Sequence, residues 1–489
     1  MMEKVPTKID VLRTLFLNDR AICAIFFLVI QQLIVASSTI WISDLSGAII
    51  DGKNILIYLA LFVTSLFVVY IPGIISSYYL EKAKNLGLYR YIEYFSRNYK
   101  GNPTLITEKT IREEREPWLI GESGRTIEEV FSVGYDGLST GLNTSLNILA
   151  LCYVFGIKIL LGYGACVLIL PIISRCYKNN LRNKANQFQA DRKSMYQSLL
   201  SSWDNITAGN QYNFLLWWRK FNNCWEAVNK SSVKAVFVTQ LSSVSSVIFL
   251  LVAVMGNFFW IFLTTNSSAK LAALVATLPR QIQILQHFEI LSSYVMLWHG
   301  TYTRLKNLLE SLDIPATADR QNLLNRVKWN EIIFEFNHRQ KYLKSFSEFI
   351  EILHTTRTGR LTIRGANGTG KTTLINLAKQ ELGDNAFYLP TNSQLIFEST
   401  LDQGLSTGQK VKAYLDEISK LISRDATDEK RGSLYPILLL DEWSANLDIQ
   451  NATLVSEQLE SIAKSRFLIE ISHRQINTFG TENFFKTPK

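Results

Sequence analysis

Long apolar runs fill the first 300 residues of the chain, and short apolar segments separated by polar loops follow them. A helix that crosses about 30 Å of hydrocarbon needs roughly 20 apolar residues, and six runs approach that length, at residues 21–41, 55–78, 135–155, 157–173, 238–263 and 271–296. The third run is the weakest because Gly137, Gly141 and Asn143 interrupt it. The pattern predicts a membrane part at residues 1–310, a linker at 311–329 and a soluble domain at 330–489.

The connections between these runs differ in length and charge. The short turns at 43–54, 156–158 and 264–270 carry one lysine each, whereas the two long connections carry nine and ten basic residues. Because Lys and Arg are enriched in cytoplasmic loops, both long connections and both chain ends are expected in the cytoplasm. Long connections opposite short turns also predict helices that continue past the bilayer and reverse near residues 117–125 and 208–213.

Composition changes this interpretation little. The chain has 489 residues, of which 47% are hydrophobic, and a formal charge of +9. A positive charge also occurs in proteins that bind nucleic acid, but here Lys and Arg gather beside the apolar runs and form no separate basic stripe. We therefore expect a lipid bilayer as partner and no nucleic acid.

The sixth apolar run is unusually polar, because it contains Arg280, Gln281, Gln283, Gln286, His287 and Glu289. Ionisable groups at membrane depth cost several kcal/mol unless they face a cavity or a partner. We expect a water-accessible pathway through the membrane, lined by Arg280, Gln283, Gln286 and His287. Hydrogen bonds between helices and a span that begins elsewhere are the alternatives.

A glycine-rich segment, GANGTGKTT at residues 365–373, follows the short strand LTIR and precedes the helical pattern LINLAKQEL. Strand, loop and helix in this order are the setting of a P-loop, in which backbone N–H groups and the helix N-terminus surround phosphate oxygens. We expect Lys371 to reach the β and γ phosphates, Thr372 to bind Mg²⁺ and Thr373 to contact the α phosphate. The nucleotide-binding set is Gly365, Asn367, Gly368, Gly370, Lys371, Thr372 and Thr373.

A second apolar strand, at residues 437–440, ends in two adjacent carboxylates, Asp441 and Glu442. This is the Walker B arrangement of P-loop ATPases. Asp441 is expected to hold Mg²⁺, and Glu442 to polarise the attacking water as general base. The sequence therefore predicts an ATPase that uses ATP and Mg²⁺.

A third sequence element distinguishes between the classes of P-loop proteins. The segment LSTGQK at residues 405–410 resembles the ABC signature, and SANLD at 444–448 and His473 follow the second strand in the order of that family. The chain therefore resembles ABC transporters of the type IV exporter fold. This resemblance implies a membrane α-helical bundle of six transmembrane helices followed by an α/β P-loop ATPase domain, and coupling helices at the two cytoplasmic turns.

Further roles are implied by the resemblance alone. Ser406, Gly408 and Gln409 would contact the γ phosphate of ATP on the opposite subunit. Asp448 would lie at the dimer interface, and His473, with Glu442 and Lys371, would act on the γ phosphate. An aromatic residue upstream of the P-loop would stack on adenine, with Phe336 the first choice and Tyr342 the second. Both aromatic residues are equally consistent with a place in the core.

The chain departs from the family at three places. Thr391 occupies the usual position of the Q-loop glutamine, so Gln394 is the expected substitute as a metal ligand, and Thr407 replaces a signature glycine. Lys371 and Ser406 are only 35 positions apart. The resemblance places a helical subdomain in this interval, and we expect that subdomain to be largely missing.

The segment DEWSANLD resembles ATPases of cyclic-peptide and siderophore-peptide exporters. We expect an ABC-type translocase that hydrolyses ATP and exports a peptide or peptide-derived product across the bacterial inner membrane, with its ATPase domain in the cytoplasm. A second copy of the chain is the expected partner, although a heterodimer is also consistent. The alternatives are a lipid or drug exporter, a siderophore importer of the same fold, and a regulatory membrane ATPase that does not transport.

Overall fold

The computed structural model describes residues 7–52, 54–106, 108–199, 201–265, 267–313, 320–336, 339–391, 395–398, 407–425, 437–445, 447 and 449–472. The chain divides into two compact units. The first comprises Met1–Glu93 and Gly121–Glu310, and the second comprises Tyr94–Ile120 and Ser311–Lys489. A segment of the first long connection thus groups with the C-terminal part of the chain.

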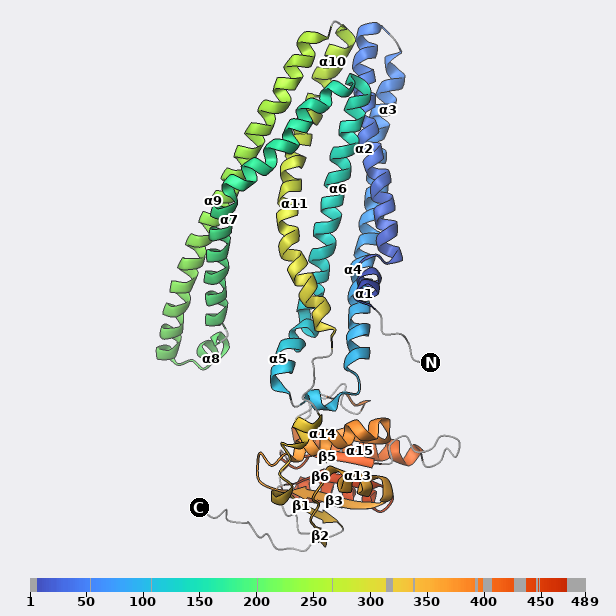
Figure 1. Ribbon diagram of the computed structural model, residues 1–489, viewed down its shortest axis with the longest axis vertical. Helices are drawn as coiled ribbons and strands as arrows, with labels where there is room; N and C mark the ends of the chain where they lie inside the picture. Colours follow the sequence, from blue (N-terminus) through green and yellow to red (C-terminus); the bar gives the residue numbers. More distant parts are fainter. Residues whose placement is uncertain are drawn as a thin grey trace. The chain divides into compact units, whose positions relative to one another are not determined.

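The first unit is entirely helical in its described residues (Figure 1). A short helix, α1, precedes the long helices, and the 3₁₀ turn η3 and the short helix α8 lie between them. The bounds are α1 Lys8–Phe16, α2 Asp19–Asp51, α3 Ile55–Val68, α4 Tyr70–Tyr99, α6 Ser123–Phe155, η3 Ile157–Ile159, α7 Leu160–Leu199, α8 Ser202–Thr207, α9 Gln211–Thr264, α10 Ser268–Ala276 and α11 Leu278–Ser311.

Each of the six expected spans falls within these helices, but they are not equally apolar. Four stretches are long and apolar enough to cross a membrane: Asp19–Asp51, Ile55–Tyr99, Lys109–Phe155 and Gln211–Thr264. A fifth candidate, Ile157–Ile173 with Arg175–Leu199, bends by 46°. Pro171, which removes one backbone hydrogen bond from the helix, lies just before this bend.

The expected sixth span, at residues 271–296, corresponds to α10 and the first part of α11. Neither helix meets the same criterion of length and apolarity among the described residues. The physical reason is the polar sequence from Arg280 to Glu289, which lowers the mean hydropathy of α11. Six spans therefore remain a prediction, whereas a helical membrane region with four or five apolar helices is observed.

Helices α7 and α9 pack along each other as a long hairpin that ends at α8 (Figure 1). The indole Nε1 of Trp217 donates to the carbonyl oxygen of Ser198 over 2.9 Å and closes this end of the hairpin. The chain breaks between α8 and α9 at residues 208–210, within the expected turn at 208–213, because Gly209 has φ +72° and α9 begins at Gln211.

The first reversal, by contrast, lies earlier than the expected 117–125. There the chain is helical throughout, in α5 (Lys109–Pro117), a π-helical turn η2 (Trp118–Glu122) and the start of α6. The chain turns instead between α4 and α5, where Gly101 has φ +82° and the 3₁₀ turn η1 (Pro103–Ile106) follows. Glycine and proline end α4 at this point because neither favours a continuing helix.

The second unit is built on a six-stranded sheet in the order β2-β1-β3-β6-β5-β4. Strands β3, β6, β5 and β4 are parallel, and β1 and β2 are antiparallel additions. Their bounds are β1 Ile333–Phe336, β2 Arg339–Lys341, β3 Gly359–Arg364, β4 Ala386–Leu389, β5 Ile437–Asp441 and β6 Phe467–Ile471. Strands β5 and β6 are buried throughout, and they are apolar apart from Asp441 and Glu470, as expected for the centre of a parallel sheet.

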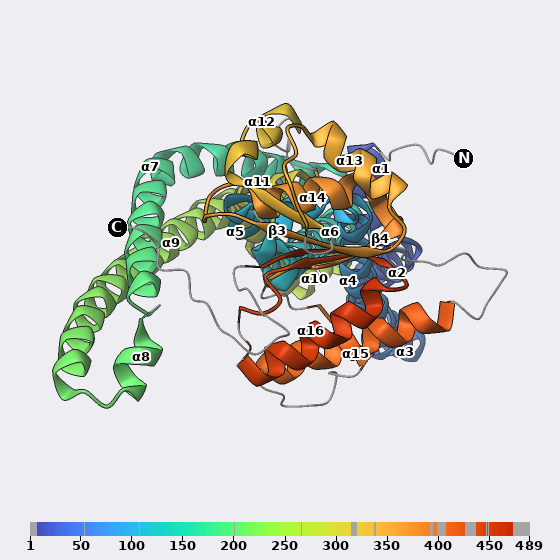
Figure 2. The ribbon, with the colours of Figure 1, turned by 90° about the horizontal axis from the view of Figure 1, so that it is seen from below.

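Helices cover both faces of this sheet (Figure 2). The helices are α12 (Arg320–Leu324), α13 (Phe346–Thr355), α14 (Lys371–Leu382), α15 (Thr407–Asp425) and α16 (Ile449–Ala463). Because strand side chains alternate between faces, Leu439 and Ile469 pack with α13 and α14, whereas Leu438 and Leu468 pack with α15 and α16. The structure thus forms a layered α/β domain.

The interval between β4 and α15 is short. Helix α15 begins 18 positions after Leu389, and the described residues between them, 390–391 and 395–398, contain no α-helix. Phe397 lies in this interval and stacks on Tyr414 of α15 with 4.2 Å between ring centroids. This contact ties the interval directly to the core under α15.

Candidate nucleotide site

The P-loop lies between β3 and α14, and two of its glycines adopt conformations that other residues avoid. Gly368 and Gly370 have φ values of +82° and +91°. A Cβ atom at Gly370 would lie 2.8 Å from the carbonyl oxygen of Arg326 and 2.9 Å from Cα of Val327. Only glycine therefore allows the loop to pass this close to the segment that precedes β1.

A cavity of about 500 Å³ opens above this loop. Its lining is Asn367, Gly368, Gly370, Lys371, Thr372, Thr373 and Glu442. The parallel register of β3, β6 and β5 brings the segment after β3 and the segment after β5 to the same edge of the sheet. The volume lies within the usual range of small-ligand sites, and the loop N–H groups and the α14 N-terminus suit an anionic ligand.

Lys371 begins α14 and turns back over the loop. Its Nζ donates to the carbonyl oxygens of Gly365 and Ala366, over 2.8 and 2.9 Å. Burial lowers the pKa of Lys371, and the nearby carboxylates of Glu442 and Asp441 oppose that shift. These contacts keep the ammonium group at the cavity, where phosphate oxygens can replace the two carbonyl oxygens as acceptors.

Asp441 is the last residue of β5 and is buried. Its Oδ1 accepts a hydrogen bond of 3.3 Å from Thr372 Oγ1, and its carbonyl oxygen accepts one of 2.8 Å from Thr391 Oγ1. Burial, and then repulsion from Glu442, raise the pKa of Asp441 to about 6. A hydroxyl and a carboxylate at this distance are the donor set expected for Mg²⁺ in a P-loop site.

Glu442 follows β5 with φ +49°, the one described non-glycine residue with a positive φ. Its side chain lines the cavity opposite the P-loop residues. Left-handed backbone is disfavoured for a residue with a Cβ and persists where the surroundings hold it, often at active sites. A carboxylate in this place has the position expected of a general base.

The raised pKa of Asp441 leads to a testable pH dependence. Between about pH 4 and pH 6 the folded protein binds a proton at Asp441 more tightly than the unfolded chain does, so this residue's contribution to stability falls as the pH rises through that window. We expect Asp441→Asn to raise the melting temperature of the nucleotide-free protein at pH 7.5. At pH 4.5 the difference between variant and wild type should shrink.

Differential scanning fluorimetry of both proteins at the two pH values measures this difference, in which the titration of groups remote from Asp441 cancels. Two pKa units correspond to about 2.7 kcal/mol as an upper limit. A difference in melting temperature that is equal at both pH values, or larger at pH 4.5, would contradict the assignment.

Several expected site residues lie outside the described residues: Gln394, Ser406, Asp448 and His473. Gly408 and Gln409 are in the first turn of α15, and Gln409 is exposed and does not line the cavity. The structure thus brings together the P-loop residues and Glu442 at one cavity, and Asp441 is bonded to Thr372 of the same loop. The roles of all these residues remain predictions.

The two aromatic residues expected to stack on adenine differ in their surroundings. Phe336 is partly buried, and its ring packs edge-to-face on Phe467 with 6.1 Å between centroids. It therefore belongs to the core in this structure. Tyr342 is 64% exposed. Neither lines the cavity, and adenine stacking remains a prediction for both.

Sequence reasoning missed the contacts between the P-loop and two distant segments. Lys328 N donates to the carbonyl oxygen of Thr369 over 3.0 Å, η1 packs against α14, and Arg326 Nη1 lies 3.1 Å from Glu108 Oε1. All these residues belong to the second unit. The P-loop is thereby linked to the connection that follows α4.

The expected pathway residues lie on α11 in the first unit. Arg280 Nη1 donates to Gln283 Oε1 over 2.6 Å, and Arg280 Nη2 donates to Ser38 Oγ of α2 over 3.1 Å. Gln283 and Gln286 are exposed, and His287 is half-buried. Both expectations, an open pathway and hydrogen bonds between helices, are compatible with this arrangement.

A second polar set, between α2 and α6, was missed by sequence reasoning. Asn143 Nδ2 donates to Gln32 Oε1 over 2.7 Å, and Thr39 Oγ1 donates to Asn147 Oδ1 over 2.7 Å. Asn143 was noted only as a weakness of its span. Polar residues spaced three or four apart in an apolar helix are the signal that indicates such contacts.

Comparison with solved structures identifies the fold of the whole chain. The chain is similar to a bacterial Atm1-family ABC exporter whose structure was determined with ATP bound, with a TM-score of 0.56 and 13% sequence identity over 93% of this chain and 91% of that one. No protein-family model and no curated protein matches the sequence. At this identity the likeness establishes the fold: the chain has the fold of an ABC exporter.

Proposed function

We propose that this chain is an ATP-driven transporter, and the observation that carries the proposal is one cavity that unites a P-loop with Glu442. The cavity lining contains Lys371, Thr372 and Glu442, which would supply a phosphate contact, a Mg²⁺ ligand and a base for phosphoryl transfer from ATP. The ABC exporter fold supports the coupling of hydrolysis to transport.

In the proposed ATPase cycle Lys371 moves from the loop carbonyls to the β and γ phosphates. Thr372 and Asp441, whose oxygens are 3.3 Å apart, would hold Mg²⁺, which neutralises phosphate charge when bound. Glu442 orients the attacking water and accepts its proton. Gln394 and His473 are proposed as an additional metal ligand and a γ-phosphate contact.

We propose that two copies of the chain work together. In such a dimer the signature residues Ser406, Gly408 and Gln409 complete the site of the partner, with Asp448 at the interface. The tip of the α7–α9 hairpin carries large exposed aromatic side chains: Trp203, Tyr212, Trp218 and Trp225. Exposed apolar patches often mark interfaces, and this tip is the proposed contact with the second copy.

The proposed cargo is a peptide or peptide-derived product, exported across the bacterial inner membrane with the ATPase domain in the cytoplasm. Carboxamide side chains of Gln32, Asn143 and Gln283 offer donors and acceptors that match those of peptide bonds. Together with Arg280 they form polar contacts within a mostly apolar helical unit. The DEWSANLD segment supports the same cargo class.

Purified full-length protein in proteoliposomes tests this function. ATP-dependent uptake of cyclic peptides into inside-out vesicles, with matching stimulation of ATP hydrolysis, is the expected result. Lys371→Ala serves as the inactive control. Stimulation by lipids or hydrophobic drugs alone would exclude the peptide cargo, and hydrolysis that no cargo stimulates would exclude the transport function.

One observation favours a second function, a membrane ATPase that regulates without transporting. The described residues between β4 and α15 hold no α-helix. In the family that this chain resembles, coupling helices dock on a helical subdomain in this interval, so the docking surface in this chain is smaller. Contacts of η1 with α14 and of Arg326 with Glu108 offer a substitute route. The vesicle experiment separates the two functions, because only a transporter moves its cargo.

A further inference from the structure

A buried carboxylate lies at the side of the sheet that faces α16. Glu470 of β6 has a side chain only 2% exposed. Arg360 of β3 donates to it from Nε over 2.9 Å and from Nη2 over 3.0 Å. Thr362 Oγ1 and Trp443 Nε1 donate to it over 2.8 Å each. Four donors thus satisfy this one carboxylate.

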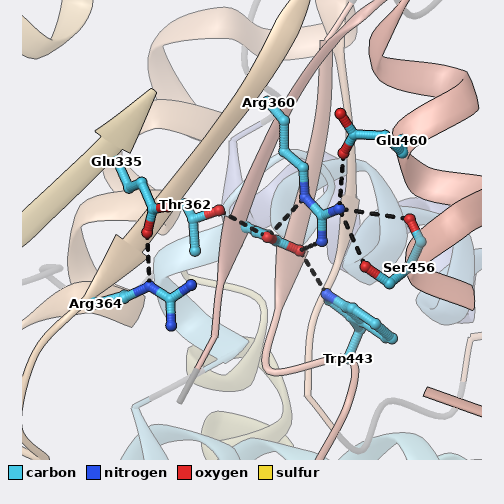
Figure 3. Close-up of polar contacts among 8 residues, drawn as sticks. Glu335, Arg360, Thr362, Arg364, Trp443, Ser456 and Glu460 are labelled. Atoms are coloured by element: carbon cyan, nitrogen blue, oxygen red, sulfur yellow. Dashed lines mark hydrogen bonds and ion pairs between the residues drawn. The ribbon is translucent and has the colours of Figure 1, made fainter. Parts of the chain in front are cut away.

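The same arginine reaches a second element. Arg360 Nη1 lies 3.1 Å from Glu460 Oε2 and 3.2 Å from Ser456 Oγ, both on α16 (Figure 3). The sheet register explains why these groups lie together. Glu470 of β6 pairs with Thr362 of β3 on one side and with Leu440 of β5 on the other. The polar cluster therefore joins β3, β6, α16 and the turn after β5.

Trp443 is the member of the cluster that adjoins the nucleotide site. It follows Glu442, the residue with φ +49°, and it is itself buried in the core formed with α15 and α16. Buried Asp441 precedes Glu442, and Ala445 N donates to the carbonyl oxygen of Glu442 over 3.1 Å. The buried residues on either side of Glu442 thus hold its disfavoured backbone conformation in place.

We propose that Trp443 is a positioning residue, whose indole N–H, anchored by Glu470, holds the Glu442 carboxylate at the nucleotide cavity. Arg360 and Thr362 position the Glu470 carboxylate, and therefore act on Glu442 only through Glu470 and Trp443. This inference rests on the proposed ATPase function, since it assigns a role in that reaction.

Packing alone does not account for the cluster. A phenylalanine at position 443 would fill the same core without a polar partner, and buried ion pairs are generally no more stabilising than apolar residues of equal volume. A fully hydrogen-bonded network, by contrast, admits one arrangement of its members. The network can therefore hold the turn that carries Glu442 in a single geometry, which an apolar core would not do.

The test compares Trp443→Phe and Glu470→Gln with Glu460→Gln in the full-length protein. Glu460→Gln makes the same change on the same arginine but does not touch Trp443. Trp443→Phe and Glu470→Gln are expected to lower kcat for ATP hydrolysis about tenfold, the effect of one hydrogen bond to a charged group. The KM for ATP should stay within about twofold, and Glu460→Gln should keep the wild-type kcat.

A double variant shows whether the effect passes through Glu442. Adding Trp443→Phe to Glu442→Gln should cause no further loss in single-turnover rate, because the two changes then remove the same contribution. Additive losses would overturn the proposal, as would a Trp443→Phe variant with wild-type kcat or with equal losses in kcat, nucleotide affinity and melting temperature.

Hydrogen exchange gives a measure that does not require turnover. In Trp443→Phe, faster exchange confined to residues 441–447, with the P-loop unchanged, supports the anchor, and unchanged exchange overturns it. Absence of hydrolysis by the wild type would count against the proposed function alone, and the exchange result would still decide the role of Trp443.

Discussion

Glu442→Gln is expected to lower ATP hydrolysis by the full-length protein about 10²- to 10⁴-fold, the contribution of a positioned general base. The amide keeps the shape of the side chain at the cavity but does not accept a proton from the attacking water. The contacts that Lys371 and the P-loop offer to phosphate remain in place. ATP binding should therefore be retained.

Hydrolysis in lipid nanodiscs and equilibrium ATP binding measure the two effects separately. Glu335→Gln is a matched control: it makes the same change on β1, where the carboxylate pairs with Arg364 over 3.1 Å and does not line the cavity. If Glu442→Gln kept wild-type turnover, another group would be the base. If both variants lost turnover equally, the loss would reflect the domain as a whole.

Lys371→Ala is expected to weaken ATP binding about 10- to 100-fold and to abolish measurable hydrolysis. Hydrogen bonds to charged groups contribute roughly 1.5 to 3 kcal/mol each, and every 1.4 kcal/mol is about tenfold in affinity. The change removes the ammonium group that now bonds the loop carbonyls of Gly365 and Ala366. No other described lysine lines the cavity.

Fluorescent ATP analogue titration in nanodiscs checks this, with Lys379→Ala as the control. Lys379 lies on the same helix, and its ammonium group also bonds backbone carbonyl oxygens, those of Gly383 and Ala386, but it is two turns from the cavity. Wild-type affinity in Lys371→Ala, or an equal loss in both variants, would contradict a direct phosphate contact.

Local patterns were the part of the sequence that could be interpreted with most success. The P-loop, its following helix and the Asp441–Glu442 pair were found because each consists of consecutive residues whose geometry depends on near neighbours. The apolar helices were found for a similar reason, since hydrocarbon thickness sets their length. The polar α11 was the exception, because composition alone does not show whether its side chains face lipid, a cavity or another helix.

The positions of the turns in the two long connections illustrate a different limit. The breaks near Gly101 and Gly209 decide where the chain reverses, yet glycine is also common within these helices, as at Gly134 and Gly137 of α6. Only the backbone conformation shows which glycines have a positive φ. The grouping of Tyr94–Ile120 with the C-terminal unit was likewise hidden, because its contacts lie more than 200 residues away in the sequence.

The sequence by itself determined the two kinds of domain, the phosphate-binding loop and the pair of carboxylates, because hydrophobic period, chain flexibility at glycine and adjacency are local properties. Only the tertiary structure decided that Glu442 faces the P-loop, that Arg326 meets Glu108, and that Trp443 is held by Glu470. These contacts depend on the order and register of strands β3, β6 and β5. That order is set by the packing of the whole core, and no short segment of the chain encodes it.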